Sequence, residues 1–311
     1  MKALVASPGK EGNLDLVDVP ELEPRPNQAV VGVAAASLNR GEVSALQNAE
    51  QGWRPGWDVA GVVTQRAADG TGPAEGRRVA GLVGGGAWAE RTVVPTATLA
   101  ELPDGVSFED AATLPVAGLT ARRALELTVI EGKNVAITGA AGGVGRFAVQ
   151  LAAQAGASVT AVVGSAERGA GLADLGASDV VVGGLAAEGD PLTLILESVG
   201  GDSLSAAIAR VAPDGLIVSF GNSSRQPTTF NASTLYRKNG ARLHGFVLWP
   251  ELQRSGTAVT DLRYLAMLVG MGHLNPGIDR VVAWDDLVAV RSLIADFLSR
   301  RVKGKAVLRI G

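Results

Sequence analysis

The chain has 311 residues, 47% of them hydrophobic and 19% charged, which is enough apolar material for two ordinary cores and excludes a small disulfide scaffold. Its 28 Lys and Arg against 31 Asp and Glu leave a formal charge of −3 without blocks of like charge, which argues against nucleic acid or a polybasic membrane surface as a partner. Because there is no cysteine and there are only two histidines, disulfides, thiolate nucleophiles and an ordinary catalytic zinc site are excluded.

Residues 1 to about 110 carry short apolar runs separated by segments rich in Gly, Pro and Asn. This spacing predicts an antiparallel, barrel-like domain. The expected strands are KALVAS, LDLVDV, AVVGVAAASL, VAGVVTQR, RRVAGLV and ERTVVP. The pattern changes near ELPDGVSFEDAATLPVAG, where two prolines flank a polar stretch, and we expect a domain boundary there.

From Asn134 to Leu248, six strand-length apolar runs alternate with segments long enough for helices. The runs lack polar alternation, so both faces are expected to be buried, as in a doubly wound parallel sheet. The expected strands are NVAITG, SVTAVV, DVVVGG, LTLILESV, GLIVSF and RLHGFVL, and the expected helices are VGRFAVQLAAQAG, ERGAGLADLG, SLSAAIARVAP and TTFNASTLYRKNG. The tail predicts helices near DLRYLAMLVGMG and DDLVAVRSLIADFLSRR, and strands DRVVAW and KAVLRI.

The strongest local signal is the strand, glycine-rich turn and helix of NVAITGAAGGVGRFAVQLAAQAGA. Ala140 takes the first position of a dinucleotide fingerprint, Gly142 lets the backbone approach a pyrophosphate, and Gly145 lets the helix lie close to the strand. Gly143 and Val144 then open the helix whose free N–H groups face the phosphates. The alternative is a turn that serves tight packing alone.

The end of the second strand of this sheet discriminates between the nicotinamide cofactors. An NAD site usually has Asp or Glu there for the ribose 2′-hydroxyl, whereas SVTAVVGSAER offers Gly164, Ser165 and Arg168. A 2′-phosphate fits this set better, because Ser165 can donate a hydrogen bond and Arg168 can pair with the phosphate. The alternative is that Ser165 caps a helix and Arg168 is solvated.

Several segments together resemble the zinc-independent quinone oxidoreductases of the medium-chain dehydrogenase/reductase family. They are SLNRGE, PGWDVAGVV, GGAWAERTVVP, LPDGVSFEDAATLPVAGLTARRAL, AAGGVG, LADLGASDVV, ESVGG, SFGNSS and VKGKAVL, in an order and spacing that cover almost the whole chain. The resemblance implies an α/β protein with a GroES-like β-barrel domain, residues 1–112 and 250–311, and an inserted Rossmann domain with a six-stranded parallel sheet, residues 113–249.

The resemblance also implies hydride transfer without zinc. Where zinc-dependent relatives carry a GHE motif, this chain reads Gly56-Trp57-Asp58, so the ligand histidine is replaced by Trp57. Negative charge on the substrate oxygen must then be stabilised by backbone, hydroxyl or amide donors. Asn39 matches the family's active-site asparagine and is the best side-chain candidate, unless it is a turn residue that satisfies the backbone.

The chain departs from the family at a proton donor. Many quinone reductases carry a tyrosine five residues after that asparagine, and here the position is Ser44. Neither Tyr236 nor Tyr264 lies in a segment that matches a catalytic one. Either Ser44 or solvent then delivers the proton, or the acceptor is a quinone whose reduced oxygens take protons from water.

Residue-by-residue transfer from the family implies further contacts with the cofactor, all near the carboxyl ends of the parallel strands. The expected residues are Gly118, Leu119 and Thr120 beside the nicotinamide, Val199 and Gly200 over the cofactor, Gly221, Asn222 and Ser223 at its ribose or pyrophosphate, and Phe246, Val247 and Leu248 near the carboxamide. For SFGNSS the alternative is an ordinary strand-end turn.

Three tryptophans fall in loops that border the substrate site in this family. Trp53, Trp57 and Trp88 together suggest an apolar, flat substrate pocket. Burial in the domain core is the competing interpretation, above all for Trp88.

The sequence therefore predicts a zinc-free, NADPH-dependent reductase of a quinone or an α,β-unsaturated carbonyl. Two alternatives stay open, a reductase of enoyl or enone intermediates of secondary metabolism, some of them thioesters, and an NADPH-binding sensor or structural protein without turnover. Since RLHGFVLW (242–249) is expected to be the outermost strand of the sheet, we also expect a homodimer. MKALVASPGKEGNLDL lacks the apolar run of a signal peptide, and no run is long enough to span a bilayer, which predicts a soluble, cytoplasmic protein.

Overall fold

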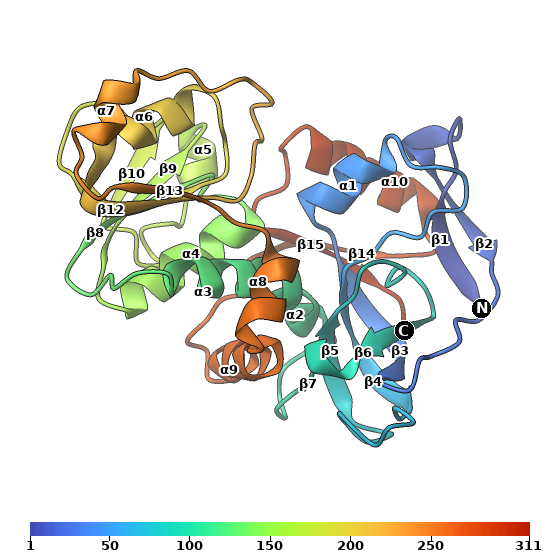
Figure 1. The fold of residues 1–311 in the computed structure, drawn as a ribbon. Helices are drawn as coiled ribbons and strands as arrows, with labels where there is room; N and C mark the ends of the chain where they lie inside the picture. The colour runs from blue at the N-terminus through green and yellow to red at the C-terminus, as the bar shows by residue number, and fades with distance from the viewer. The chain divides into compact units, whose positions relative to one another are not determined.

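The computed structural model describes all 311 residues and divides into two compact units, Met1–Leu119 with Ser255–Gly311, and Thr120–Arg254. These boundaries lie a few residues beyond 112/113 and 249/250. The first unit contains a seven-stranded and a two-stranded sheet, and the second unit a six-stranded sheet (Figure 1).

The first unit contains a mainly antiparallel seven-stranded sheet in the order β14-β15-β3-β4-β5-β7, with β6 paired to β3. Its strands are β3 (Gln28–Ser37), β4 (Asp58–Gln65), β5 (Arg78–Leu82), β6 (Arg91–Pro95), β7 (Leu99–Glu101), β14 (Ile278–Ala283) and β15 (Lys305–Arg309), and β1 (Lys2–Ala6) pairs separately with β2 (Leu14–Asp18). Most of β3 alternates between buried and half-buried residues, as in a strand with one face on a core. Antiparallel pairing of β15 with β3 brings the C-terminal tail into the sheet built by the N-terminal strands.

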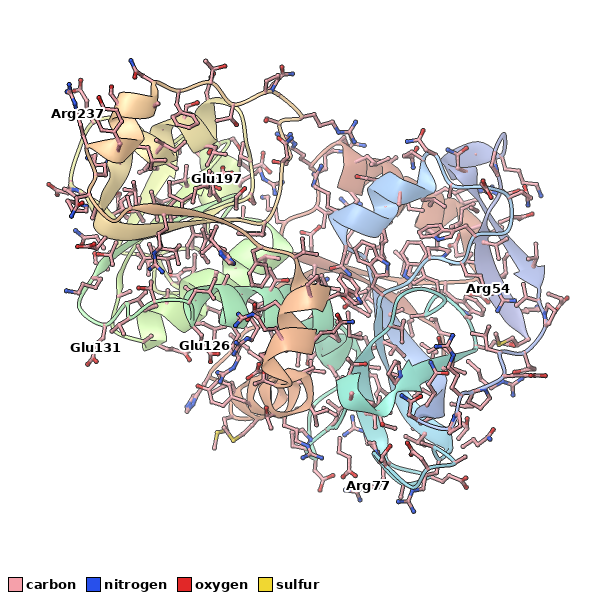
Figure 2. The ribbon with its side chains drawn as sticks, in the orientation of Figure 1. Arg54, Arg77, Glu126, Glu131, Glu197 and Arg237 are labelled. Carbon is pink, nitrogen blue, oxygen red and sulfur yellow. The ribbon has the colours of Figure 1, made fainter.

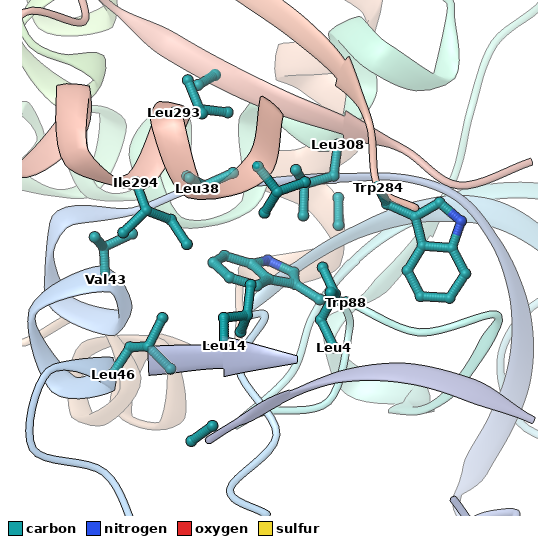
Figure 3. Packing of buried hydrophobic residues seen from close by; sticks show 14 of the residues in the cluster. Leu4, Leu14, Leu38, Val43, Leu46, Trp88, Trp284, Leu293, Ile294 and Leu308 are labelled. Atoms are coloured by element: carbon teal, nitrogen blue, oxygen red, sulfur yellow. The ribbon is translucent and has the colours of Figure 1, made fainter. Parts of the chain in front are cut away.

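Helices and short turns complete this unit. They are η1 (Glu11–Asn13), α1 (Arg40–Leu46), η2 (Thr96–Thr98), α2 (Phe108–Ala112), the π-helix η3 (Leu114–Gly118), α9 (Ala258–Gly270) and α10 (Leu287–Leu298). Between the helices and the sheet lies an apolar cluster in which the ring of Trp88 packs among Leu4, Leu14, Leu38 and Leu308 (Figure 3).

The second unit contains a six-stranded sheet with every neighbouring pair parallel, in the order β10-β9-β8-β11-β12-β13. Its strands are β8 (Asn134–Thr138), β9 (Ser158–Val163), β10 (Asp179–Val182), β11 (Leu192–Glu197), β12 (Val211–Ser219) and β13 (Arg242–Gly245). From β8 the chain adds β9 and β10 on one side, and then returns to add β11, β12 and β13 on the other side of β8. The boundary between β8 and β11 is therefore the switch point of a Rossmann sheet. The expected fold class is confirmed, and each of the six expected strands of this sheet is present in whole or in part.

The helices of this unit are α3 (Leu119–Leu125), which begins at the unit boundary, α4 (Gly143–Gln154), α5 (Ala166–Gly169), α6 (Asp202–Arg210), α7 (Ala232–Tyr236) and α8 (Leu248–Ser255), which ends at it. α4 lies along one face of the sheet, and α6 with α7 along the other (Figure 1). None of the chain's helices is long and apolar enough to cross a bilayer.

Three expected elements are shorter than the sequence pattern predicts. In TTFNASTLYRKNG only α7 is helical. In ERGAGLADLG only α5 is helical, because Gly171 and Gly176 adopt positive φ angles of 78° and 103° that break the helix. The expected strand RLHGFVLW was wrong in its second half, since β13 ends at Gly245 and α8 begins at Leu248.

Candidate functional site

The turn after β8 is shaped by glycine. Gly142 is the N-cap residue of α4, and its N–H donates to the Gly139 carbonyl at 2.9 Å. A Cβ on Gly145 would lie 2.5 Å from the Gly139 oxygen and 2.6 Å from the Ala140 Cα, so only glycine lets the helix approach the strand end this closely. The first N–H groups of α4, from Gly143 onward, have no partner within the helix and are available to an anion.

Hydrogen bonds join this turn to the loops after β11 and β12. The Ser198 N–H donates to the Thr138 hydroxyl at 2.9 Å, and the Ser223 N–H donates to the Ser198 carbonyl at 3.1 Å. The Ser224 N–H reaches the Val199 carbonyl at 2.8 Å. We call the loops Gly139–Gly145, Ser198–Gly201 and Phe220–Ser224 the carboxyl-edge loops. The structure thus brings together the sequence-predicted residues Ala140, Gly142, Gly143, Val144, Gly145, Val199, Gly200, Gly221, Asn222 and Ser223.

The end of β9 carries no carboxylate before the exposed Glu167. Gly164 and Ser165 are exposed and Arg168 is half-buried. The Ser165 hydroxyl oxygen accepts the Arg168 N–H at 3.4 Å and caps α5, so the capping alternative describes part of its role. Its hydrogen is still able to donate to a ligand.

The side chains of the segment Phe246–Leu248, after β13, differ in their exposure to solvent. The Phe246 N–H donates to the Ser219 carbonyl at 2.8 Å, which ties this segment to the end of β12. Phe246 and Leu248 are buried, whereas Val247 is 62% exposed. Of the three, only Val247 offers its side chain to a ligand. Thr120, near the start of α3, is buried.

In the first unit, Asn39 belongs to a buried polar cluster with Ser37, Glu42, Asp58 and Lys305, which we call the Asn39 cluster. Asn39 is the N-cap of α1, and its N–H and the Glu42 carboxylate form a capping box at 2.7 Å. Its Nδ2 donates to Glu42 Oε1 at 3.1 Å and to Asp58 Oδ2 at 2.8 Å, and its Oδ1 accepts from Lys305 Nζ at 2.7 Å.

The hydrogen bonds of Asn39 bear on its expected role as a donor to a substrate oxygen. An amide nitrogen has two hydrogens, and both are directed at carboxylates inside the cluster. No hydrogen remains for a substrate oxygen in this arrangement. Asn39 therefore acts here on the cluster itself, and donation to an oxyanion would need a rearrangement.

Glu42 is a fully buried acid of the cluster. Burial and the neighbouring Asp58 carboxylate raise the pKa of Glu42 from 4.5 to about 8. The N–H groups of Gly56 and Trp57 donate to its Oε2 at 3.0 and 2.8 Å, and together with the Asn39 donors they favour the charged form. Burial and Asp58 therefore raise the pKa of Glu42, whereas its hydrogen-bond donors lower it.

Asp58 and Lys305 form the charged centre of the cluster. Lys305 Nζ lies 3.2 Å from Asp58 Oδ2 and also donates to the Leu38 carbonyl at 3.1 Å. Asp58 Oδ2 accepts the Ser37 hydroxyl at 2.5 Å, and Oδ1 accepts the Val116 N–H at 2.7 Å. A buried ion pair thus fixes the backbone of the π-helix η3 against β4.

Ser44 lies on α1. Its side chain is half-buried, and its hydroxyl makes no hydrogen bond. The next residue, Ala45, lines an open pocket of about 480 Å³. The lining residues are Ala45, Ala49, Glu50, Gln51, Gly52 and Trp53.

The three tryptophans occupy different environments. Trp53 lines that pocket, and Trp57 is half-buried with its ring against Gly41, where a Cβ would lie 2.6 Å away. The expected place of Trp88 in a substrate pocket is wrong, because its side chain is fully buried in the apolar core. The backbone carbonyl of Trp88 accepts a hydrogen bond from the Leu4 N–H at 2.9 Å, which joins β1 to this residue.

Sequence reasoning assigned no role to Glu42, Lys305 or Glu197, all of which are buried in hydrogen-bonded networks. A signal existed for Glu42, since an acid three residues after Asn39 is the spacing of a capping box. Glu197 and Lys305 lie in ESVGG and VKGKAVL, which carried the family resemblance without a stated role.

Comparison with known proteins gives consistent matches. Residues 25–104 match the alcohol dehydrogenase GroES-like domain, and residues 143–254 match the zinc-binding dehydrogenase domain. A quinone oxidoreductase of Pseudomonas aeruginosa is 32% identical over 238 residues, 72% of this chain and 71% of that protein. Erythronolide synthase EryA2 of Saccharopolyspora erythraea is 36% identical over 234 residues, 70% of this chain, and the match spans only 6% of the synthase. The structure of the quinone oxidoreductase from Coxiella burnetii superposes with a TM-score of 0.84 at 29% identity, over 100% of this chain and 99% of that one.

Proposed function

The chain belongs to the quinone oxidoreductase-like family of the medium-chain dehydrogenases/reductases, and on that premise we propose that it is a zinc-free, NADPH-dependent reductase of quinones or α,β-unsaturated carbonyl compounds. The observation that carries the proposal is the glycine-shaped turn at the switch point of a parallel sheet, where the Gly145 position has no room for a Cβ.

The carboxyl-edge loops fit a dinucleotide. The N–H groups at the start of α4, beginning with Gly143, would receive the diphosphate. Val199, Gly200 and the segment Gly221–Ser223 would hold the half of the cofactor that carries the nicotinamide. When bound, NADPH supplies the hydride from its nicotinamide ring. The protein's contribution is to orient the ring and to keep water away.

The preference for NADPH rests on the end of β9. Ser165 and Arg168 offer a hydroxyl hydrogen and a guanidinium to a 2′-phosphate, and no carboxylate stands at the strand end to bind a ribose 2′-hydroxyl.

The donor set of the Asn39 cluster does not fit zinc. The chain has no cysteine, Trp57 stands where a ligand histidine would be, and the carboxylates of Glu42 and Asp58 are occupied by N–H, O–H and ammonium donors. Purified protein should keep its activity in a chelator.

A quinone is the favoured acceptor because the chain lacks a dedicated proton donor. Both amide hydrogens of Asn39 are engaged, and Ser44 stands where many quinone reductases carry a tyrosine. The oxygens of a reduced quinone take protons from water, so their reduction needs no positioned acid. Trp53, on the wall of the pocket beside α1, offers a flat apolar surface to a ring.

A second candidate is reduction of an enone or enoyl intermediate, thioesters included. It is favoured by the similarity of 70% of the chain to a segment of erythronolide synthase EryA2. For this chemistry the free Ser44 hydroxyl would be the proton donor. A cofactor-binding sensor without turnover is the remaining alternative.

The test is stopped-flow absorbance of NADPH oxidation against matched panels of quinones and enones, with NADPH affinity measured separately by titration. Turnover of quinones, with or without turnover of enones, supports the first candidate, and turnover of enones alone supports the second. Tight NADPH binding with no turnover on either panel would support a cofactor-binding sensor without turnover. Failure to bind NADPH or NADH would refute all three.

A further inference from the structure

Glu197, the last residue of β11, is a fully buried carboxylate with no cationic partner. Figure 2 shows it amid the elements of its unit, whereas Glu126 and Glu131 lie at the edge. Its donors are all neutral. Oε1 accepts the Ser203 hydroxyl at 2.8 Å, the Val199 N–H at 3.0 Å, the Gly200 N–H at 3.2 Å and the Thr138 hydroxyl at 3.3 Å, and Oε2 accepts the Gly200 N–H at 3.0 Å.

A buried carboxylate is costly unless its lone pairs are filled, and here neutral groups alone fill them. Packing would be served equally by an apolar side chain. A carboxylate only accepts hydrogen bonds, so its distinctive property is that it draws several donors to one point. Two of those donors are consecutive N–H groups of the loop Ser198–Gly201.

The conformation of the loop Ser198–Gly201 goes together with these hydrogen bonds to Glu197. Gly200 and Gly201 adopt φ angles of 74° and 56°, so the chain turns sharply back over the Glu197 side chain. A Cβ on Gly200 would lie 2.2 Å from Asn222 Oδ1, which means that the loop is pressed against the segment after β12.

Thr138 extends the arrangement across the switch point. Its hydroxyl hydrogen is shared between Glu197 Oε1 and the Leu196 carbonyl, each at 3.3 Å. The hydroxyl oxygen accepts the Ser198 N–H at 2.9 Å, and the Ser198 hydroxyl returns a bond to the Thr138 carbonyl at 3.0 Å. Thr138 is the last residue of β8, directly before Gly139 of the glycine-shaped turn. Glu197 therefore stands where the loops from β8 and β11 meet.

We propose that Glu197 is a positioning residue for the dinucleotide. By holding Val199 and Gly200 through their N–H groups and Thr138 through its hydroxyl, it keeps the loop beneath the nicotinamide half in register with the turn beneath the diphosphate. The proposal rests on the proposed function, because it takes a dinucleotide to be the ligand of the carboxyl-edge loops.

The test compares two variants with a matched control. Glu197→Gln replaces one acceptor oxygen by an amide donor that faces the Gly200 N–H, and Thr138→Val removes the bridging hydroxyl without a change in size. Arg210→Met is the control, since Arg210 binds the carbonyls of Ala186, Glu188 and Asp190 before the start of β11, away from the carboxyl edge.

Titration of the full chain with NADPH should give a Kd raised about tenfold or more in both variants. The KM for NADPH should rise with it, while kcat at saturating NADPH changes far less. Amide exchange at residues 198–201 of the ligand-free protein should accelerate in both variants. In Arg210→Met exchange should accelerate only near residues 186–190, and Kd should stay as in the wild type.

The outcomes separate the two proposals. A wild-type protein that binds no NADPH refutes the proposed function, whatever the variants do. A wild type that binds NADPH, with variants of unchanged Kd and unchanged exchange at 198–201, overturns the positioning role alone. If Arg210→Met weakens NADPH binding as much as the two variants do, the rise in Kd comes from general destabilisation of the unit. That result would also overturn the positioning role of Glu197.

Discussion

Lys305 and Asp58, 247 positions apart, form an ion pair of 3.2 Å in which both side chains are at most 2% exposed. The pair joins the first residue of β15 to the first residue of β4. A buried pair adds little net stability compared with apolar packing, but removal of one partner leaves the other charge buried and uncompensated. This asymmetry makes the pair a sensitive test of the Asn39 cluster.

Lys305→Met should therefore lower the free energy of unfolding by about 3–5 kcal/mol, because Asp58 is left charged in the core. The double variant Lys305→Met with Asp58→Asn should recover part of the loss. Urea unfolding measures both. Arg77→Met, which breaks an exposed pair with Glu101, is the control and should have little effect. A loss in Lys305→Met no larger than in the control would contradict the buried geometry.

The raised pKa of Glu42 has a consequence for stability against pH. Between its ordinary value of 4.5 and about 8, the folded protein keeps a proton that the unfolded chain has released. The free energy of unfolding contributed by Glu42 is then greatest below pH 4.5 and falls as the pH rises toward 8. Glu42→Gln should lack this slope, so the stability of the variant relative to wild type should increase over that range.

Urea unfolding of both proteins at half-unit steps from pH 5 to 8 measures that difference. A difference independent of pH would mean that the N–H groups of Asn39, Gly56 and Trp57 keep Glu42 charged throughout.

The parts of the site that the sequence predicted are local ones. The family resemblance is confirmed, and the glycine turn was readable because Ala140, Gly142 and Gly145 act within one strand, turn and helix. The capping of α5 by Ser165 was likewise a stated alternative. Each of these features depends on residues within a few positions of one another.

The parts that the sequence did not predict depend on partners far apart in the chain. The Oδ1 of Asn39 accepts a hydrogen bond from Lys305, 266 positions away, and both of its amide hydrogens are directed at the carboxylates of Glu42 and Asp58. No local sequence pattern shows this network. Trp88 and Trp53 look alike in sequence, and only the packing of the β1–β2 hairpin and α10 around Trp88 decides that it is core. Glu197 is a single acid at a strand end, and its importance comes from donors on three separate segments.

Cofactor preference can be tested at Arg168. Arg168→Ala should weaken NADPH binding by roughly 1–3 kcal/mol, because a charge-assisted contact with the 2′-phosphate is lost. NADH lacks that phosphate, so its affinity serves as the internal control and should not change. Fluorescence titration with both cofactors gives the two constants. Equal wild-type affinity for NADPH and NADH, or an equal loss in the variant, would speak against a 2′-phosphate site.

The association of subunits can be tested at β13, which is an edge strand with all four residues exposed. An unpaired edge can add the same strand of a second copy, and we expect a homodimer. Leu243→Lys should shift the protein toward monomer, whereas Val288→Lys, a change at an exposed apolar residue of α10 in the other unit, should not. Light scattering at micromolar concentration distinguishes the states, and a monomeric wild type would refute the expectation.

The source of the proton can be tested at Ser44, whose hydroxyl is half-buried and makes no hydrogen bond. Ser44→Ala should leave kcat for a quinone unchanged, because the reduced quinone oxygens take protons from water. With an enone, loss of a positioned acid should lower kcat by ~10²-fold or more. The variant should fold as stably as wild type, in contrast to Asn39→Ala, which opens the buried cluster and should lower stability.

Comparing the two acceptors on one variant protein removes differences in folding and in cofactor affinity from the result. A fall in kcat for both acceptors would make Ser44 a general part of the reaction and would contradict protonation of the quinone by water. An unchanged kcat for both would remove Ser44 from the chemistry, because an enolate formed without it must then be protonated by solvent. If turnover of the enone alone falls, Ser44 supplies the proton that the tyrosine supplies in the family, and a carbonyl acceptor that needs a positioned acid becomes the favoured substrate.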